Sequence, residues 1–242
     1  MTKGVRCPLD RLAEGRRELP AEAARYLTRV HRLSIGDCFL AFDPEAGVEA
    51  DARMTEVRAA AVSCELGPVR AAGRVSKLAV TLIQALGKGD RVEQVVRDTT
   101  QLGVQRIVLV ETERSVVRLL GKGRDKHARY RSVAVQSCRQ CGRGDAPLIL
   151  GPMRLDEAFV LVSDAALKLC LDEGASRPLR QHLEEQPPLG SAAALIGPEG
   201  GLSAGELAAA GRAGFTQVRL APFTLRTETA AVAALAVLAQ YY

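Results

Sequence analysis

The 242-residue chain lacks any long hydrophobic run, because no stretch approaches the roughly 20 apolar residues that a membrane helix needs. Its first residues, MTKGVRCPLDRLAEGRR, also lack the apolar core of a secretory signal. Hydrophobic residues nevertheless make up 47% of the sequence, which is typical of a globular protein with a substantial core. We therefore expect a soluble, cytoplasmic protein with no membrane partner.

Metal-ligand spacing is also missing from the sequence. The three histidines have no such spacing, and Cys138 and Cys141 form the one Cys-x-x-Cys pair among six scattered cysteines. This pair falls in HARYRSVAVQSCRQCGR, a segment typical of a helix, where residues three apart share a face. The sequence thus predicts reduced, buried or half-buried cysteines and no metal.

Two nucleotide-binding fingerprints are absent as well. Neither Gly-x-Gly-x-x-Gly nor a P-loop Gly-Lys-Ser/Thr occurs, which argues against a dinucleotide-dependent enzyme. The net charge of +5 and the pI near 9.0 are compatible with nucleic-acid binding, but also with many enzymes that never touch it.

The first seventy or so residues have the pattern of a small, mostly antiparallel β domain. A short helix is expected after Pro20, and short, partly alternating segments follow at 38–43, 47–57 and 59–67. The helix is expected to bury a face made of Ala23, Ala24, Leu27 and Val30. Residues 67–76 have the composition of a linker.

From residue 77 onward, strands alternate with helices, which predicts a parallel α/β sheet with helices on both faces. Strands are expected at 77–86, 105–112, 165–173, 191–197 and 216–222. Helices are expected at 89–103, 124–140, 206–213 and from Thr227, a plausible N-cap, to Tyr242. The helix at 206 begins with a capping box, Ser203 and Glu206, and stops at Gly214.

The stretch GPEGG, residues 197–201, follows a buried strand directly, and the loop at 221–227 follows another. Ligands of open α/β sheets bind at these carboxyl ends of parallel strands. Glycine lets the backbone approach a ligand closely, whereas Glu199 would repel a phosphate. A ligand with a positive centre and an adenosine, such as S-adenosylmethionine, fits these features better than a nucleotide does.

The C-terminal sequence LIGPEGGLSAGELAAAGRAGFTQVRLAPFTLRTETAAVAALAVL resembles that of the ribosomal RNA small subunit methyltransferase E family. The resemblance continues through KGDRVEQVVRDTTQLGVQRIVLVETERSVV and QCGR and, more weakly, through YLTRVHRLSIGD. It implies S-adenosylmethionine-dependent methylation of N3 of a uridine in 16S rRNA of the small ribosomal subunit. It also implies an α/β fold of the SPOUT type, with a trefoil-knotted parallel sheet over residues 73–242, a small PUA-like β-barrel for RNA binding over residues 1–72, and a homodimer.

Carried over residue by residue, the resemblance implies cofactor contacts in three segments. The residues concerned are Leu171, Asp172, Glu173, Leu195, Ile196, Gly197, Pro198, Glu199, Gly200, Gly201, Leu220, Leu225, Arg226 and Thr227. For catalysis, the uracil N3–H must be unpaired and lose its proton, after which a cation stabilises the charge on O2 and O4. We expect Arg226 to be that cation, and Glu199 or Glu228 to be a base or a positioning group.

The chain departs from the family pattern at five positions, with Asp98, Gln101, Arg139, Ala221 and Phe223 replacing the usual Lys, Glu, Glu, Gly and Arg. The cofactor loop is intact, so cofactor binding is a firmer expectation than the RNA target. Two alternatives follow: a related methyltransferase with a different RNA target, or a non-catalytic RNA-binding relative. Binding of S-adenosylmethionine separates an enzyme from a bare RNA-binding module.

Overall fold

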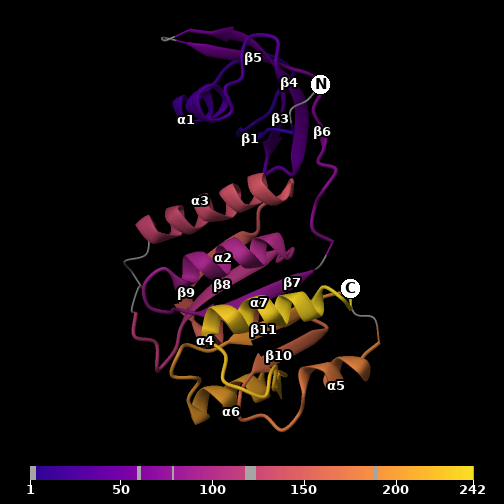
Figure 1. Ribbon diagram of the computed structural model, residues 1–242. Coiled ribbons are helices and arrows are strands. Elements are labelled where there is room, and N and C mark those ends of the chain that lie inside the picture. The colour runs from indigo at the N-terminus through magenta and orange to yellow at the C-terminus, as the bar shows by residue number, and fades with distance from the viewer. Residues whose placement is uncertain (1–3, 59–60, 78, 118–123, 188–189, 242) are drawn as a thin grey trace. The chain divides into compact units, whose positions relative to one another are not determined.

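The computed structural model describes residues 4–58, 61–77, 79–117, 124–187 and 190–241 (Figure 1). The chain divides into two compact units. One holds the described residues up to Val75 together with Val135–Ala146, and the other holds Ser76–Ala134 and Pro147 onward. Within the described ranges, no helix is both long enough and apolar enough to span a bilayer.

The first unit contains a mixed six-stranded sheet with the order β1-β3-β4-β5-β2, in which β6 pairs with β4. Only β1 and β3 are parallel, so the expected mostly antiparallel arrangement is confirmed among the described strands. The strands are β1 (Arg6–Pro8), β2 (Gly15–Glu18), β3 (Cys38–Asp43), β4 (Val48–Val57), β5 (Val62–Leu66) and β6 (Arg70–Ala71). The linker expected at 67–76 is wrong in its middle, because Arg70 and Ala71 pair with Glu49 and Val48.

The expected short helix is α1 (Ala21–Arg25), which continues as a wider π-helical turn, η1 (Tyr26–Val30). Ala23 and Leu27 are buried as expected, but Val30 is exposed. The prediction for Val30 assumed 3.6 residues per turn. A π turn, with its i to i+5 hydrogen bonds, carries the residues after Leu27 around to another face.

The second unit is built on a six-stranded sheet with the order β12-β10-β11-β7-β8-β9, and all of its pairings are parallel. The parallel α/β prediction is therefore confirmed. The strands are β7 (Val80–Ala85), β8 (Arg106–Glu111), β9 (Leu148–Arg154), β10 (Leu167–Leu171), β11 (Ala192–Ile196) and β12 (Thr216–Val218). The helices are α2 (Arg91–Gln101), α4 (Leu155–Leu161), α5 (Leu179–Glu184), α6 (Ala204–Arg212) and α7 (Thr227–Leu238). A further helix, α3 (Arg124–Cys141), is shared, because its residues from Val135 onward belong to the first unit.

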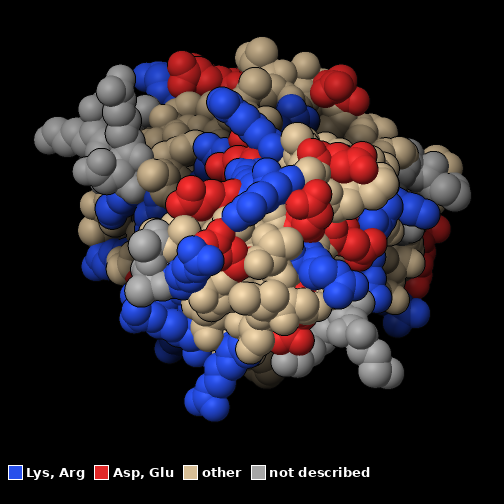
Figure 2. All heavy atoms as spheres, turned by 90° about the horizontal axis from the view of Figure 1, so that it is seen from above, with Lys and Arg blue, Asp and Glu red and all other residues tan. Residues whose placement is uncertain are grey.

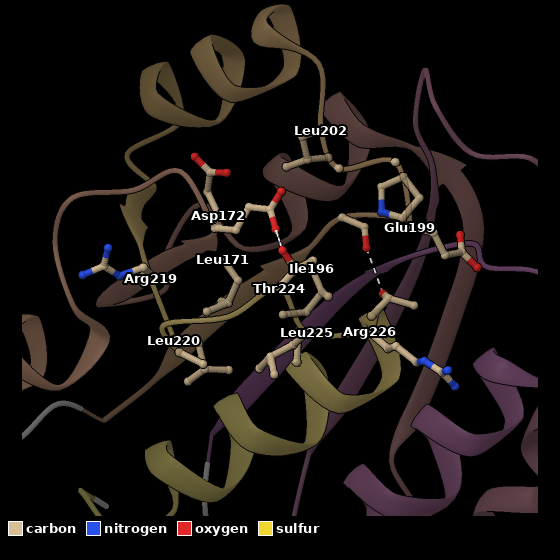
Figure 3. A pocket seen from close by; sticks show the side chains of 18 of the residues that line it. Leu171, Asp172, Ile196, Glu199, Leu202, Arg219, Leu220, Thr224, Leu225 and Arg226 are labelled. Atoms are coloured by element: carbon tan, nitrogen blue, oxygen red, sulfur yellow. Dashed lines mark hydrogen bonds between the residues drawn. The ribbon is translucent and has the colours of Figure 1, made fainter.

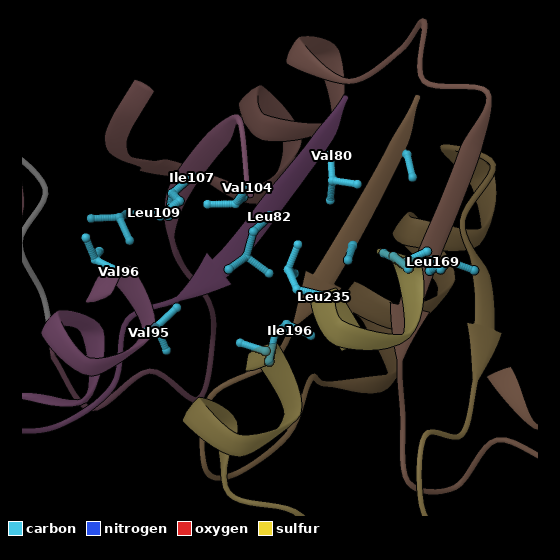
Figure 4. Packing of buried hydrophobic residues seen from close by; sticks show 14 of the residues in the cluster. Val80, Leu82, Val95, Val96, Val104, Ile107, Leu109, Leu169, Ile196 and Leu235 are labelled. Carbon is cyan, nitrogen blue, oxygen red and sulfur yellow. The ribbon is translucent and has the colours of Figure 1, made fainter. Parts of the chain in front are cut away.

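Both faces of this sheet are covered by helices (Figure 1). Alternate residues of one strand point to opposite faces, so Leu82 of β7 packs with α2 and α7, whereas Ile83 packs with α4 and α6. Figure 4 shows the first of these cores, in which Leu235 of α7 lies among the side chains of the strands. Each such buried aliphatic side chain stabilises the fold by about 1.5–3 kcal/mol.

The last helix, α7, begins one residue earlier than expected. Its N-cap is Arg226, and Thr227 is the first helical residue, so the prediction that Thr227 is the N-cap is wrong. Burial explains the difference, because the Thr227 hydroxyl is directed into the protein and bonds to other elements. The helix ends at Leu238, and the expected end at Tyr242 lies outside the described residues.

Candidate functional site

A cavity of about 560 Å³ lies where β10, β11 and β12 end and α7 begins. Its apolar wall includes Leu171, Ile196, Leu220 and Leu225, which come together in Figure 3. Most of the residues expected at the site line it: Leu171, Asp172, Glu173, Ile196, Gly197, Pro198, Glu199, Gly200, Gly201, Leu220, Leu225, Arg226 and Thr227. The three segments in which cofactor contacts are expected therefore meet at one cavity.

Two expected residues are not among those that line the cavity. Leu195 is fully buried on the opposite face of β11, where it packs in the core that α4 and α6 cover. Its neighbour Ile196 points to the cavity instead, because successive strand residues alternate between faces. Glu228 lies just beyond the wall and is only 7% exposed.

The GPEGG loop is held in one conformation from several sides. Gly201 has a φ of +69°, which favours glycine, and a Cβ at Gly197 would lie 3.2 Å from Leu202 Cγ. Arg114, in the turn that follows β8, donates from Nη1 to the Gly200 carbonyl at 2.9 Å. The loop is thus a rigid part of the wall.

The capping box expected after this loop is confirmed. Ser203 Oγ accepts from the Glu206 amide at 3.3 Å, and Glu206 Oε2 accepts from the Ser203 amide at 2.9 Å. The other oxygen of Glu206 accepts from the Glu113 amide at 2.7 Å. The start of α6 is therefore bonded to the turn that follows β8.

Thr227 joins three elements beneath the cavity. Its Oγ1 donates to the Gly197 carbonyl at 2.8 Å and accepts from Gln84 Nε2, in β7, at 2.9 Å. Gln84 is buried, and its Oε1 has no hydrogen-bond partner among the described residues. The contact fixes the first turn of α7 against the ends of β7 and β11.

Arg91, the first residue of α2, faces two carboxylates. Its Nη1 donates to Glu199 Oε1, and its Nε lies 4.0 Å from Glu228 Oε2. Burial acts to raise the pKa of Glu199. The backbone amides of Glu199 and Lys88 and the Arg91 charge outweigh burial, and the pKa falls below the ordinary value. Glu199 is therefore ionised and already paired, which suits a positioning group better than a proton acceptor.

The second loop is braced by the end of β10. Thr224 Oγ1 donates to Glu173 Oε2, as Figure 3 shows, and Asp172 Oδ1 accepts from the Gly174 amide at 3.2 Å. Arg226 is exposed, and its guanidinium has no hydrogen bond or ion pair within the part of the chain that the structure describes. Both Arg219 and Arg226 point away from the leucines of the wall (Figure 3). These two cations are available to a ligand at the mouth of the cavity.

Three residues at the site were not anticipated from the sequence: Gln84, Arg91 and Arg114. For Arg91 a signal exists, because a cation in the first turn of a helix is disfavoured by the helix dipole unless an anion compensates it. Its partner, Glu199, is 108 residues away in the sequence. Gln84 and Arg114 carry no comparable signal.

The Cys-x-x-Cys pair takes no part in this site. Burial raises the pKa of the Cys138 thiol to about 12, and its Sγ donates to the Asp145 carbonyl at 3.2 Å. All six cysteines are free, as expected, and the described residues contain no group of His, Cys, Asp and Glu that could hold a metal. A thiol with so high a pKa is a packing group rather than a nucleophile.

Comparison with known proteins agrees with this geometry. The sequence pattern of the RNA methyltransferase domain family matches residues 74–239. The ribosomal RNA small subunit methyltransferase E of Mycobacterium bovis is 35% identical over 161 residues, covering 64% of this chain and 61% of the relative. This chain therefore spans less than two thirds of that relative's length.

Two solved structures are similar over nearly the whole chain. A protein from Legionella pneumophila, solved in complex with the cofactor SAM, has a TM-score of 0.87 and 33% identity, covering 98% of this chain and 97% of that one. The ribosomal RNA small subunit methyltransferase E of Neisseria gonorrhoeae, bound to S-adenosyl methionine, has a TM-score of 0.84 and 28% identity, covering 99% and 98%.

Proposed function

The chain belongs to the ribosomal RNA small subunit methyltransferase E family, and from this premise we propose that it methylates N3 of a uridine in 16S rRNA, using S-adenosylmethionine. The observation that supports this most directly is the cavity itself. The glycine loop, the β10 end and the loop before α7 meet there around an apolar wall. The reaction would take place in the cytoplasm, on the small ribosomal subunit.

The residues present suit the cofactor. The cavity volume falls within the roughly 300–1,000 Å³ typical of ligand pockets, and an apolar wall with a few polar groups is the usual lining. Asp172, Glu173 and Glu199 supply negative charge, which complements a cation. When bound, S-adenosylmethionine supplies an electrophilic methyl group on a positively charged sulfonium.

The chain's own contribution to the reaction is alignment and charge stabilisation. Loss of the N3 proton to solvent water leaves negative charge on O2 and O4 of the uracil, and a cation placed there lowers the barrier. Arg226 is exposed, lines the cavity and has no partner among the described residues, so it can supply that cation. Holding N3 in line with the methyl group provides the remaining rate enhancement.

Glu199 and Glu228 act as positioning groups in this proposal. Both face Arg91, and Glu228 Oε2 is buried with no hydrogen-bond partner among the described residues. Glu228→Gln would weaken cofactor binding and leave the shape of the pH–rate profile unchanged. If the rate of the variant no longer rose with pH as the wild-type rate does, Glu228 would instead be identified as the proton acceptor.

A homodimer and a trefoil knot are part of the same proposal. The outward face of α7 leaves Val232, Ala233 and Ala236 only partly buried within one chain. An apolar helix face of this kind is usually covered, and a second copy would cover it. The knot would be formed where the chain end packs against the strands that bound the cavity.

The first unit, a PUA-like domain over residues 1–72 in this proposal, would dock on RNA. Figure 2 shows one face of the molecule, on which Lys and Arg side chains are interspersed with Asp and Glu. Arg16 and Arg70 are paired with Glu56 and Asp51, so their charge is partly neutralised. The exposed arginines on and after the first helical segment, Arg25, Arg29 and Arg32, are better candidates for phosphate contacts.

Calorimetry and methyl transfer test this proposal. The purified chain should bind S-adenosylmethionine and transfer a labelled methyl group to small ribosomal subunits that lack the modification. Cofactor binding without transfer to these subunits would favour a methyltransferase with another RNA target. Absence of cofactor binding would favour the non-catalytic RNA-binding alternative.

A further inference from the structure

Phe223 is the most exposed large hydrophobic residue among those described, with 80% of its surface accessible. It lies in the loop between β12 and α7 and lines the cavity. Single exposed apolar residues are common and need no explanation, and Val160 at 72% is one of them. Phe223 differs from Val160 because it lies at the mouth of the cavity.

The aromatic residues of the chain make this position distinctive. There are five phenylalanines and no tryptophan. Phe39 and Phe42 are fully buried, and Phe159 and Phe215 pack together with their ring centroids 5.1 Å apart. Phe223 is thus the one phenylalanine exposed to solvent, and among the described residues that line the cavity it is the only aromatic one.

The loop that presents this ring is braced on both sides. Thr224 is hydrogen-bonded to Glu173, and Thr227 is hydrogen-bonded to the Gly197 carbonyl. Arg219 and Arg226 line the same cavity. An aromatic face beside arginines is the combination with which proteins hold unpaired nucleic acid, because bases stack on the ring and phosphates pair with the cations.

We propose that Phe223 is a positioning residue that stacks on an unpaired base of the RNA substrate at the mouth of the cavity. This inference rests on the proposed function, since methylation of N3 requires a base taken out of its stack. The adenine of the cofactor is a second possible source of a stacking base. The apolar wall around Leu171, Ile196 and Leu225 suits adenine better, because Ile196 is buried and the two leucines are half-buried, whereas Phe223 is exposed.

Fluorescence provides the direct test, because Phe223→Trp would be the sole tryptophan of the chain. A short single-stranded oligouridylate should quench this tryptophan, whereas S-adenosylmethionine alone and a fully paired RNA duplex should not. Quenching by S-adenosylmethionine alone would overturn the proposal in favour of stacking on adenine. Absence of quenching by the oligouridylate would also overturn it.

Steady-state kinetics provide the second readout. Phe223→Ala and Phe223→Leu should raise the KM for the RNA roughly 5- to 150-fold, the range expected for loss of one base–aromatic stack, with cofactor affinity unchanged. Phe223→Tyr should restore the wild-type value, and Val160→Ala is the control for loss of an exposed apolar group. An unchanged KM in Phe223→Leu, or a change in oligomeric state in Phe223→Ala, would contradict the stacking role.

The two readouts separate this inference from the proposed function. The fluorescence assay needs no turnover, so quenching in a protein that transfers no methyl group would support stacking and reject the reaction. Methyl transfer by the wild type, with Phe223→Ala equally efficient, would support the reaction and reject stacking.

Discussion

At the scale of single residues, the site contains charged side chains that face an opposite charge and one that does not. Glu199 and Glu228 face Arg91, whereas Arg226 has no partner among the described residues and lines the cavity. A paired group can hold a structure in place, and an unpaired cation can respond to charge that develops on a substrate. The roles assigned to these residues follow from that difference.

Replacement of Arg226 tests the role of the unpaired cation. Arg226→Ala should lower kcat about 10²- to 10³-fold, the usual effect of removing one group that stabilises developing charge. Arg226→Lys should retain part of the activity because it keeps the charge. Arg180→Ala is the control, since Arg180 is an exposed arginine that does not line the cavity. Full activity of Arg226→Ala in a folded protein would refute the assignment.

The Glu199 ion pair predicts a pH dependence. Because the folded-state pKa of Glu199 is lowered, its contribution to stability is complete above the ordinary glutamate pKa of about 4.3. The contribution disappears as the pH falls through the lowered pKa. The difference in Tm between wild type and Glu199→Gln should therefore be largest at neutral pH and shrink towards pH 3. A difference that stays constant with pH would show that the pair does not titrate in this way.

At the scale of elements, the sequence predicted the strands that are continuous apolar runs, such as β7, β8 and β11. It missed β9, whose sequence LILGPMR contains a Gly-Pro pair typical of a turn. Proline is tolerated there because β9 is an edge strand, which has a neighbouring strand on one side only. On its other side the strand makes no hydrogen bonds within the sheet, so the missing N–H of proline costs nothing there. Edge position is a property of the folded sheet, so local sequence could not reveal it.

The same limit applies to the site. Its loops were predictable because they follow recognisable strands, and the capping box of α6 is a local pattern. The contact of Arg91 with Glu199 and the contact of Gln84 with Thr227 join residues more than 100 positions apart. Such contacts depend on the strand order, which a single sequence does not specify.

Replacing glycine by alanine should have opposite effects on stability in the GPEGG loop and in α6. Gly201 has a φ of +69°, so Gly201→Ala should strain the GPEGG loop by about 1–2 kcal/mol and weaken S-adenosylmethionine binding. Gly211 lies in α6 with open space where a Cβ would be, so Gly211→Ala should stabilise the protein by about 0.5–1 kcal/mol. Thermal unfolding and calorimetry measure both effects. Equal cofactor affinity in the two variants would contradict the role of the loop.

At the scale of the whole molecule, the net charge of +5 predicts binding to RNA that depends on salt. Replacing Arg25, Arg29 and Arg32 with alanine should reduce the slope of log K against log salt by about 2, if each contacts one phosphate of a single strand. Arg16 and Arg58 are matched controls, because both lie within ion-pair distance of Glu56. An unchanged slope in the triple variant would place the docking surface elsewhere.

The central claim is methyl transfer to N3 of a uridine in small-subunit rRNA. The most direct measurement incubates the protein with labelled S-adenosylmethionine and small ribosomal subunits that lack the modification, then digests the RNA and identifies the labelled nucleoside by chromatography and mass. We predict labelled 3-methyluridine, strongly reduced with Arg226→Ala. A different methylated nucleoside, or no labelled nucleoside from a protein that binds the cofactor, would contradict the claim.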